Sequence, residues 1–208
     1  TGQPIPTPDY TRDNSGPPHL RMDKEIFAAL CDEMVVDAGV DLLLHTMPAE
    51  VAYANERWTV TLCTKTGLRE VRTQVLIDAT GDANVVALAG FPLVRPDVVQ
   101  PATLSMGFSG YDADKLDYEA LKAASEAAIA AGELKTTDIS WRDDGPEGLL
   151  RKYGANGNHL RAPRAETSEG RTAAEVEARR AMLRAYRFFQ KQPGLENFRI
   201  DWISPEVG

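Results

Sequence analysis

The stretch Leu76-Ile-Asp-Ala-Thr-Gly-Asp-Ala-Asn-Val-Val86 decides how this chain is interpreted. Its apolar beginning predicts a strand, which runs through the turn Ala79-Thr80-Gly81-Asp82 into a helix over residues 84–90. Because Gly81 has no Cβ, the main chain of such a turn can come close to a bound ligand. A plain tight turn between a strand and a helix has the same pattern, so both interpretations stay open at this point.

The residues before the turn predict a helix, a buried strand and a three-stranded β-meander. A helix over residues 21–36 has one apolar side, and Gly39 follows where a left-handed stop residue is typical. Residues 40–44 read as a buried strand. The meander strands are expected around residues 49–53, 58–64 and 68–73. The continuous apolar run 75–77 is typical of a central strand covered on both faces.

After Pro92 the pattern changes to an α+β arrangement. Short strands are expected at residues 103–108, 158–163 and 198–203. One alanine-rich helix is expected over residues 112–131, and a loop-rich segment over 135–154. A second long helix should begin at the capping box Thr172-Ala-Ala-Glu175 and run to about Gln190, with an apolar stripe made by Ala178, Met182, Ala185, Tyr186 and Phe189. These elements predict a mixed or antiparallel sheet covered on one face by two long helices.

Composition narrows the classes of protein to which the chain can belong. With 208 residues, 43% of them hydrophobic, the chain can bury a sizeable core. Its net charge of -8 argues against nucleic acid as a partner. No apolar run approaches the roughly 20 residues that a bilayer span needs. Cys31 and Cys63 form no metal or redox spacing, so we expect reduced packing residues, a cytoplasmic location and no metal site.

The elements up to the turn resemble the second half of the FAD-binding domain of glutathione-reductase-like flavoproteins. More narrowly, residues 77–92 and Gln100-Pro-Ala-Thr-Leu104 are similar to segments of the FAD-dependent oxidoreductase family, and residues 18–23 and 38–46 fit it too. The resemblance implies an α/β to α+β fold with FAD as cofactor. It also implies hydride transfer between the flavin and an organic small-molecule substrate, which the protein would position.

The chain departs from that family in one respect. A flavoprotein of this kind opens with a strand and Gly-x-Gly-x-x-Gly, whose amides hold the pyrophosphate, and no such segment is present. We therefore expect an internal fragment that also lacks the C-terminal FAD segment and is inactive on its own, without bound FAD. It would comprise residues 1–92, a partial FAD-binding domain with an extended arm over 1–18, and residues 93–208, part of a substrate-binding domain. Loss of the first strands would expose a sheet edge, so a homodimer is also possible.

The resemblance assigns cofactor contacts to two segments. The main chain of Ala79, Thr80, Gly81 and Asp82 would approach FAD, and the strand at Ala49 would pass the adenine. An ordinary turn and an ordinary sheet edge remain the simpler explanations.

Two further segments are candidates for the substrate and the flavin ring. Gln100 and Thr103 would lie near the isoalloxazine, where an amide and a hydroxyl could polarise a carbonyl, although a turn before a strand explains them equally well. Strand alternation places His159 and Arg161 on one face, where they could handle a proton and a carboxylate together. Arg164 follows closely. A solvated surface strand is the alternative.

The arginine and lysine row at 180, 184, 187 and 191 is predicted to be a solvent-exposed helix face.

Two other functions remain open. The chain could be a non-catalytic binding or interaction module that retains the flavoprotein architecture. It could also belong to a flavin monooxygenase or reductase.

Overall fold

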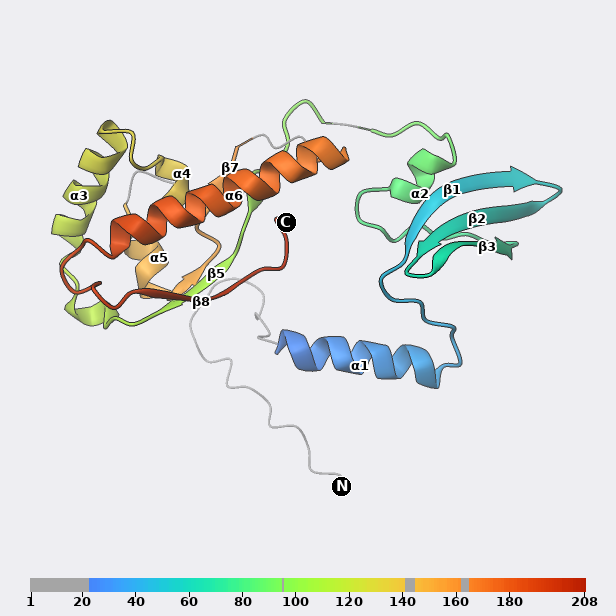
Figure 1. Cartoon of the computed structure of the whole chain (residues 1–208), viewed down its shortest axis with the longest axis horizontal. Helices are drawn as coiled ribbons and strands as arrows, with labels where there is room; N and C mark the ends of the chain where they lie inside the picture. Colours follow the sequence, from blue (N-terminus) through green and yellow to red (C-terminus); the bar gives the residue numbers. More distant parts are fainter. Residues whose placement is uncertain (1–22, 95, 141–144, 162–164) are drawn as a thin grey trace, which may run out of the picture. The chain divides into compact units, whose positions relative to one another are not determined.

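The computed structural model describes residues 23–94, 96–140, 145–161 and 165–208. The chain divides into two compact units, residues 1–92 and 93–208 (Figure 1). In the described ranges, no helix is both long and apolar enough to cross a lipid bilayer.

The first unit begins with helix α1 (Lys24–Asp37). The side chain of Asp23 caps it by accepting a hydrogen bond from the amide of Ile26 at 3.0 Å. Gly39 follows with a φ of 73°, the left-handed geometry expected after a helix end. The predicted helix and its stop residue are therefore confirmed.

An antiparallel meander forms the centre of the first unit. It consists of β1 (Met47–Ala54), β2 (Arg57–Thr64) and β3 (Gly67–Thr73), in that order. Asn55 and Glu56 both have positive φ, 51° and 59°, which is typical of the two-residue turns that join twisted hairpin strands. Val51 and Val60 pair across β1 and β2 and are buried, and helix α2 (Asn84–Leu88) packs on β1. The predicted meander and the short helix are confirmed (Figure 1).

Two predicted buried strands do not form in the described residues. Segments 40–44 and 75–77 have no strand partner, and Val75 and Ile77 are 70% and 81% exposed. The apolar side of α1 is exposed as well, since none of its residues is buried. An apolar run becomes a central strand only where neighbours supply main-chain hydrogen bonds and cover both faces. No described segment does so here.

One expectation about the cysteines was also wrong. Both are free thiols, but Cys63 on β2 is exposed, whereas Cys31 on α1 is partly buried. Only Cys31 can serve as a packing residue.

The strands of the second unit form two separate antiparallel sheets instead of one. β4 (Ala102–Thr103) pairs with β7 (His159–Leu160). β5 (Met106–Ser109) lies between β6 (Gly154–Ala155) and β8 (Arg199–Ile203). The predicted strand 103–108 is broken at Leu104 and Ser105. Leu104 is fully buried in a small cluster with Ala178 and Val207, which separates the pairing of β4 from that of β5.

Helices surround the larger sheet of the second unit. They are the 3-10 turn η1 (Ala113–Lys115), α3 (Tyr118–Ala130), α4 (Thr136–Ile139), α5 (Glu147–Arg151) and α6 (Ser168–Phe189). The helix predicted from residue 112 begins only at Tyr118, because Asp117 caps it by accepting from the amide of Ala120 at 3.0 Å. The segment predicted as loop-rich contains α4 and α5. The two predicted long helices, α3 and α6, are confirmed.

The start of α6 differs from the prediction. Thr167 is the cap and accepts a hydrogen bond from the amide of Gly170 at 3.1 Å. Thr172 lies inside the helix, where its hydroxyl donates to the carbonyl of Ser168 at 2.7 Å. The carboxylate of Glu175 instead accepts from the amide of Val207 at 2.7 Å. A threonine five residues earlier therefore takes the capping role.

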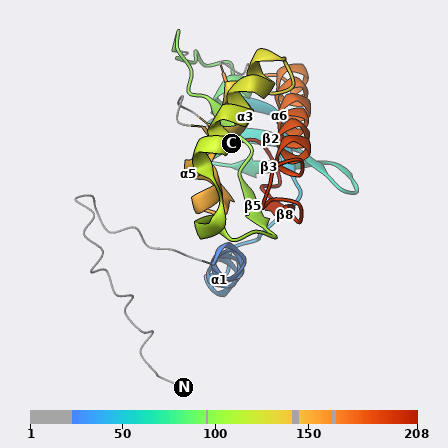
Figure 2. The same cartoon turned by 90° about the vertical axis from the view of Figure 1, so that its left-hand side faces the viewer.

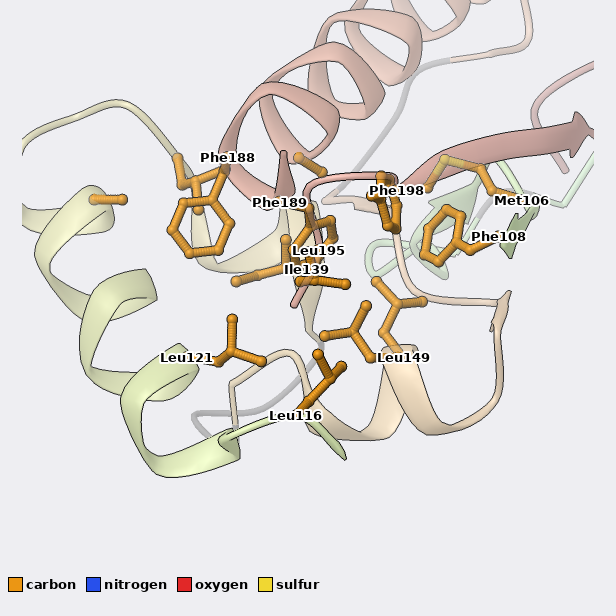
Figure 3. Packing of buried hydrophobic residues seen from close by; sticks show 14 residues of the cluster. Met106, Phe108, Leu116, Leu121, Ile139, Leu149, Phe188, Phe189, Leu195 and Phe198 are labelled. Atoms are coloured by element: carbon orange, nitrogen blue, oxygen red, sulfur yellow. The ribbon is translucent and has the colours of Figure 1, made fainter. Parts of the chain in front are cut away.

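Aromatic residues form the core of the second unit. The ring of Phe198 lies 4.8 Å from that of Phe108 and 5.0 Å from that of Phe189, and Figure 3 shows Phe198 between them, with Leu149 and Leu195 nearby. Figures 1 and 2 show α3, α5 and α6 gathered around β5 and β8. The predicted inward stripe of α6 is confirmed, since its Ala178, Ala185 and Phe189 are buried and Met182 and Tyr186 pack against the same core.

Candidate functional site

The turn after residue 77 is held by the carboxylate of Asp78. Its Oδ1 accepts hydrogen bonds from the amide of Thr80 at 2.9 Å and from the hydroxyl of Thr80 at 2.7 Å. Its Oδ2 accepts from the amide of Val86 at 3.0 Å, and Thr80 Oγ1 accepts from the amide of Asn84 at 2.9 Å. These bonds, above all the one from the Thr80 amide, lower the pKa of Asp78. The carboxylate thus stays ionised and fixes the turn onto α2.

The outer side of this turn is open. Gly81 has a φ of 81°, and a Cβ built on it would meet no atom within 4 Å. Among the residues that the structure describes, the amides of Ala79, Gly81 and Asp82 donate to no protein acceptor. These amides and the missing side chain fit a ligand that approaches through main-chain contacts.

Ala49, the other predicted cofactor residue, lies at a β-bulge. The pairing of β1 with β2 shifts between Pro48 and Glu50, so that Ala49 has no partner in the register. Bulges of this kind leave main-chain groups unpaired and occur often beside functional sites. Because α2 packs on β1 within this unit, the bulged strand and the helix after the Gly81 turn belong to one packed assembly.

Two predicted residues of the second unit touch each other. Thr103 lies opposite His159 in the β4–β7 pair, and Thr103 Oγ1 is 3.0 Å from His159 Nδ1. The main chain of Thr103 is fixed from its other side, since it donates to the carbonyl of Gly208 at 2.7 Å and accepts from the amide of Gly208 at 3.0 Å. Gln100 is exposed and precedes β4. Arg164 lies outside the described residues.

His159 and Arg161 line one pocket, although β7 ends at Leu160 and Leu160 lines the pocket too, so the predicted strand alternation does not account for their placement. The pocket has a volume of about 460 Å³ and is lined by Lys135, Thr136, Thr137, Asp138, His159, Leu160, Arg161 and Glu177. Partial burial lowers the pKa of His159 below its ordinary 6.5, so its imidazole is neutral near pH 7. A neutral imidazole beside a guanidinium can exchange a proton with a ligand that the guanidinium holds.

An ion network forms the floor of this pocket. Arg184 donates to both carboxylate oxygens of Asp138, at 2.8 and 2.9 Å, and to Glu177 at 3.0 Å. Glu177 also pairs with Lys135 at 2.6 Å, and this bond contributes most to lowering the pKa of Glu177. Asp138 is only 1% exposed. The prediction that Arg184 belongs to a solvent-exposed helix face is therefore wrong, because this residue ties α6 to α4.

Sequence reasoning missed Lys135, Asp138 and Glu177. Glu177 and Arg184 are seven residues apart on α6, which places them on one face and could have signalled the pair. The contact with Asp138 joins residues 46 apart and has no local signal.

Asn158, next to His159, is also buried and was not predicted. Its Nδ2 donates to the carbonyl of Ala178 at 3.1 Å, while its Oδ1 has no partner among the described residues. The bond anchors the start of β7 on α6 and so helps to place His159.

These features define an α+β protein with an open, amide-lined glycine turn in one unit and a charged pocket in the other. The sequence model of the family described as FAD dependent oxidoreductase matches residues 5–208. The chain belongs to this family, and the resemblance noted from the sequence is confirmed. Searches of curated proteins and of solved structures each found no significant match.

Proposed function

We propose that this chain is part of an FAD-dependent oxidoreductase that transfers hydride between a small organic substrate and the flavin. The family match over residues 5–208 supports redox function with FAD. The observation that carries the finer proposal is the Gly81 turn, where a Cβ would meet no atom within 4 Å and where Asp78 holds the turn onto α2. Bound FAD would supply the hydride acceptor or donor.

The first unit would hold the cofactor through its main chain. Ala79, Gly81 and Asp82 offer unpaired amides, and the bulge at Ala49 leaves main-chain groups open for an adenine. Thr80 has a different role in this proposal. Its amide and hydroxyl are already bonded to Asp78, so it would support the turn without donating its amide to FAD.

The second unit would bind the substrate. Thr103 orients the His159 ring, which as a neutral base can accept or return a proton while Arg161 fixes an acidic group. Gln100 and Arg164 remain predicted residues near the substrate or the flavin. Such groups would place the substrate over the flavin ring and accept or donate its proton, while the flavin accepts or donates the electrons.

A glycine substitution tests the cofactor site. The full reading frame that contains these residues is purified, FAD is added, and the visible flavin absorption of the protein fraction is recorded. We expect Gly81→Ala to weaken FAD binding by about tenfold or more, because a Cβ would enter the space where the ligand approaches. Gly39→Ala is the matched control, since Gly39 also has positive φ, 73°, and open surroundings.

Four outcomes distinguish the candidate functions. Flavin absorption in the wild type that is lost in Gly81→Ala but kept in Gly39→Ala supports the proposal. Flavin binding that both variants retain contradicts the assigned cofactor turn. No flavin in the wild type, even with added FAD, favours a non-catalytic binding module. Oxygen consumption with a reduced nicotinamide would identify a flavin monooxygenase instead of a dehydrogenase.

A further inference from the structure

The pocket around His159 contains one positive charge without a counter-ion. Asp138 is paired with Arg184, and Glu177 with both Arg184 and Lys135. Arg161 has no acidic partner among the described residues. The lining residues Lys135 and Arg161, together with Arg184 behind them, supply three positive charges against the two carboxylates of Asp138 and Glu177, so a single anionic group at Arg161 would balance the site.

The geometry of the lining favours a planar anion. A guanidinium presents a rigid fork of N–H donors that matches a carboxylate through two parallel hydrogen bonds. Thr136 and Thr137 are partly buried and add hydroxyl donors, while Leu160 offers an apolar surface for a short carbon chain. A volume of about 460 Å³ suits an acid of a few carbon atoms.

The two acidic residues of the pocket lining are already held in ion pairs. Asp138 is 1% exposed, and the two-point bond from Arg184 holds it between α4 and α6. Lys135 is held by Glu177 at the rim. Arg161 is therefore the lining cation that a ligand can engage without breaking an existing ion pair.

We infer that this pocket binds a small organic monocarboxylate, with Arg161 gripping the carboxylate and the reactive carbon directed toward His159. The identification of this acid as the substrate rests on the proposed flavoenzyme function. Binding itself requires no flavin. A phosphate group fits less well, because its second negative charge would have no cation to balance it.

Propionate and its neutral isostere propionamide test the inference. The 208-residue protein, labelled with ¹⁵N, is titrated with each compound while the amide resonances are followed by NMR. We expect saturable shifts at Thr137, His159 and Arg161 with propionate, with a dissociation constant on the order of 1 mM, and none with propionamide.

Two matched arginine variants complete the design. Arg161→Gln should weaken propionate binding by about tenfold or more, since the charge-assisted bonds are lost. Arg187→Gln should leave binding unchanged, because Arg187 is also exposed on this unit and lacks an acidic partner among the described residues, yet lies outside the pocket. Equal binding by Arg161→Gln and wild type would overturn the inference. So would the absence of saturable shifts in the wild type, or sulfate binding as tightly as propionate.

The result is independent of the cofactor experiment. Propionate binding in a protein whose full reading frame takes up no FAD would support the carboxylate pocket and contradict the proposed flavoenzyme function. FAD uptake without propionate binding would support the flavoenzyme function and contradict the carboxylate pocket.

Discussion

The guanidinium of Arg184 binds both carboxylate oxygens of the buried Asp138, at 2.8 and 2.9 Å, across 46 residues of sequence. This pair joins the short helix α4 to the long helix α6, and its Asp138 lines the candidate substrate pocket. Two elements that are far apart in the chain are thereby held together.

Removal of the guanidinium should destabilise the protein. Arg184→Met leaves the Asp138 carboxylate buried without its partner, and we expect the free energy of unfolding to fall by about 3 kcal/mol. Urea denaturation followed by circular dichroism measures the change. Arg180→Met, on the exposed side of the same helix, should change stability by no more than about 0.5 kcal/mol. Similar losses in the two variants would show that the pair is not important for stability.

Protonation of His159 should make stability depend on pH. Its pKa in the folded protein lies below 6.5 because of burial, so the unfolded chain takes up the proton first as the pH falls. The stabilising contribution is complete above pH 6.5 and is lost as the pH falls toward the folded pKa. His159→Gln should therefore flatten the stability profile between about pH 7.5 and 5.5. Thr103→Val keeps the imidazole and should keep the slope. An unchanged slope in His159→Gln would refute this assignment.

A single methyl group at Gly110 should disrupt the second unit. Gly110 has a φ of 87°, and a Cβ there would lie 1.8 Å from the carbonyl oxygen of Asn197, a main-chain atom that cannot rotate away. We expect Gly110→Ala to lower the free energy of unfolding by at least about 3 kcal/mol. Gly132→Ala has a similar φ of 76° but open surroundings, and should cost only about 1 kcal/mol. Thermal unfolding compares the two, and equal losses would disprove the steric account.

The exposed apolar segment 75–77 should promote self-association. Val75 and Ile77 are 70% and 81% exposed, and burial of such side chains against a second copy removes apolar surface from water. Sedimentation velocity should show a dimer that grows with concentration, and the double variant Val75→Asp with Ile77→Asp should be monomeric. Val94→Asp is the control, since Val94 is 99% exposed but lies outside this segment. A wild type that stays monomeric at high concentration would exclude this dimer.

Locally determined elements could be predicted from the sequence, because their causes lie within a few residues. The β-meander, the stop at Gly39 and the apolar stripe of α6 were all found at the predicted places. The start of α6 was predicted wrongly. Thr172-Ala-Ala-Glu175 has the pattern of a capping box, yet Thr167 caps α6 and Glu175 instead accepts a hydrogen bond from the amide of Val207.

The candidate site also contains residues that local rules predict and residues that only long-range packing brings together. His159 and Arg161 could be proposed because strand alternation is a local rule, and the glycine turn could be proposed from its own residues. Lys135 and Asp138 could not, because only the packing of α4 on α6 brings them to the pocket.

The sequence by itself determined the family, the existence of the long helices, the β-meander and the turn around Gly81, since each depends on residue type and short-range hydrogen bonds. The tertiary structure alone decided that segments 40–44 and 75–77 lack strand partners among the described residues, and that Arg184 turns inward to Asp138. Strand pairing and buried ion pairs join groups that are distant in the chain. The free energy of such contacts depends on which segment packs against them and on how much water this packing excludes. No local sequence pattern encodes these two quantities.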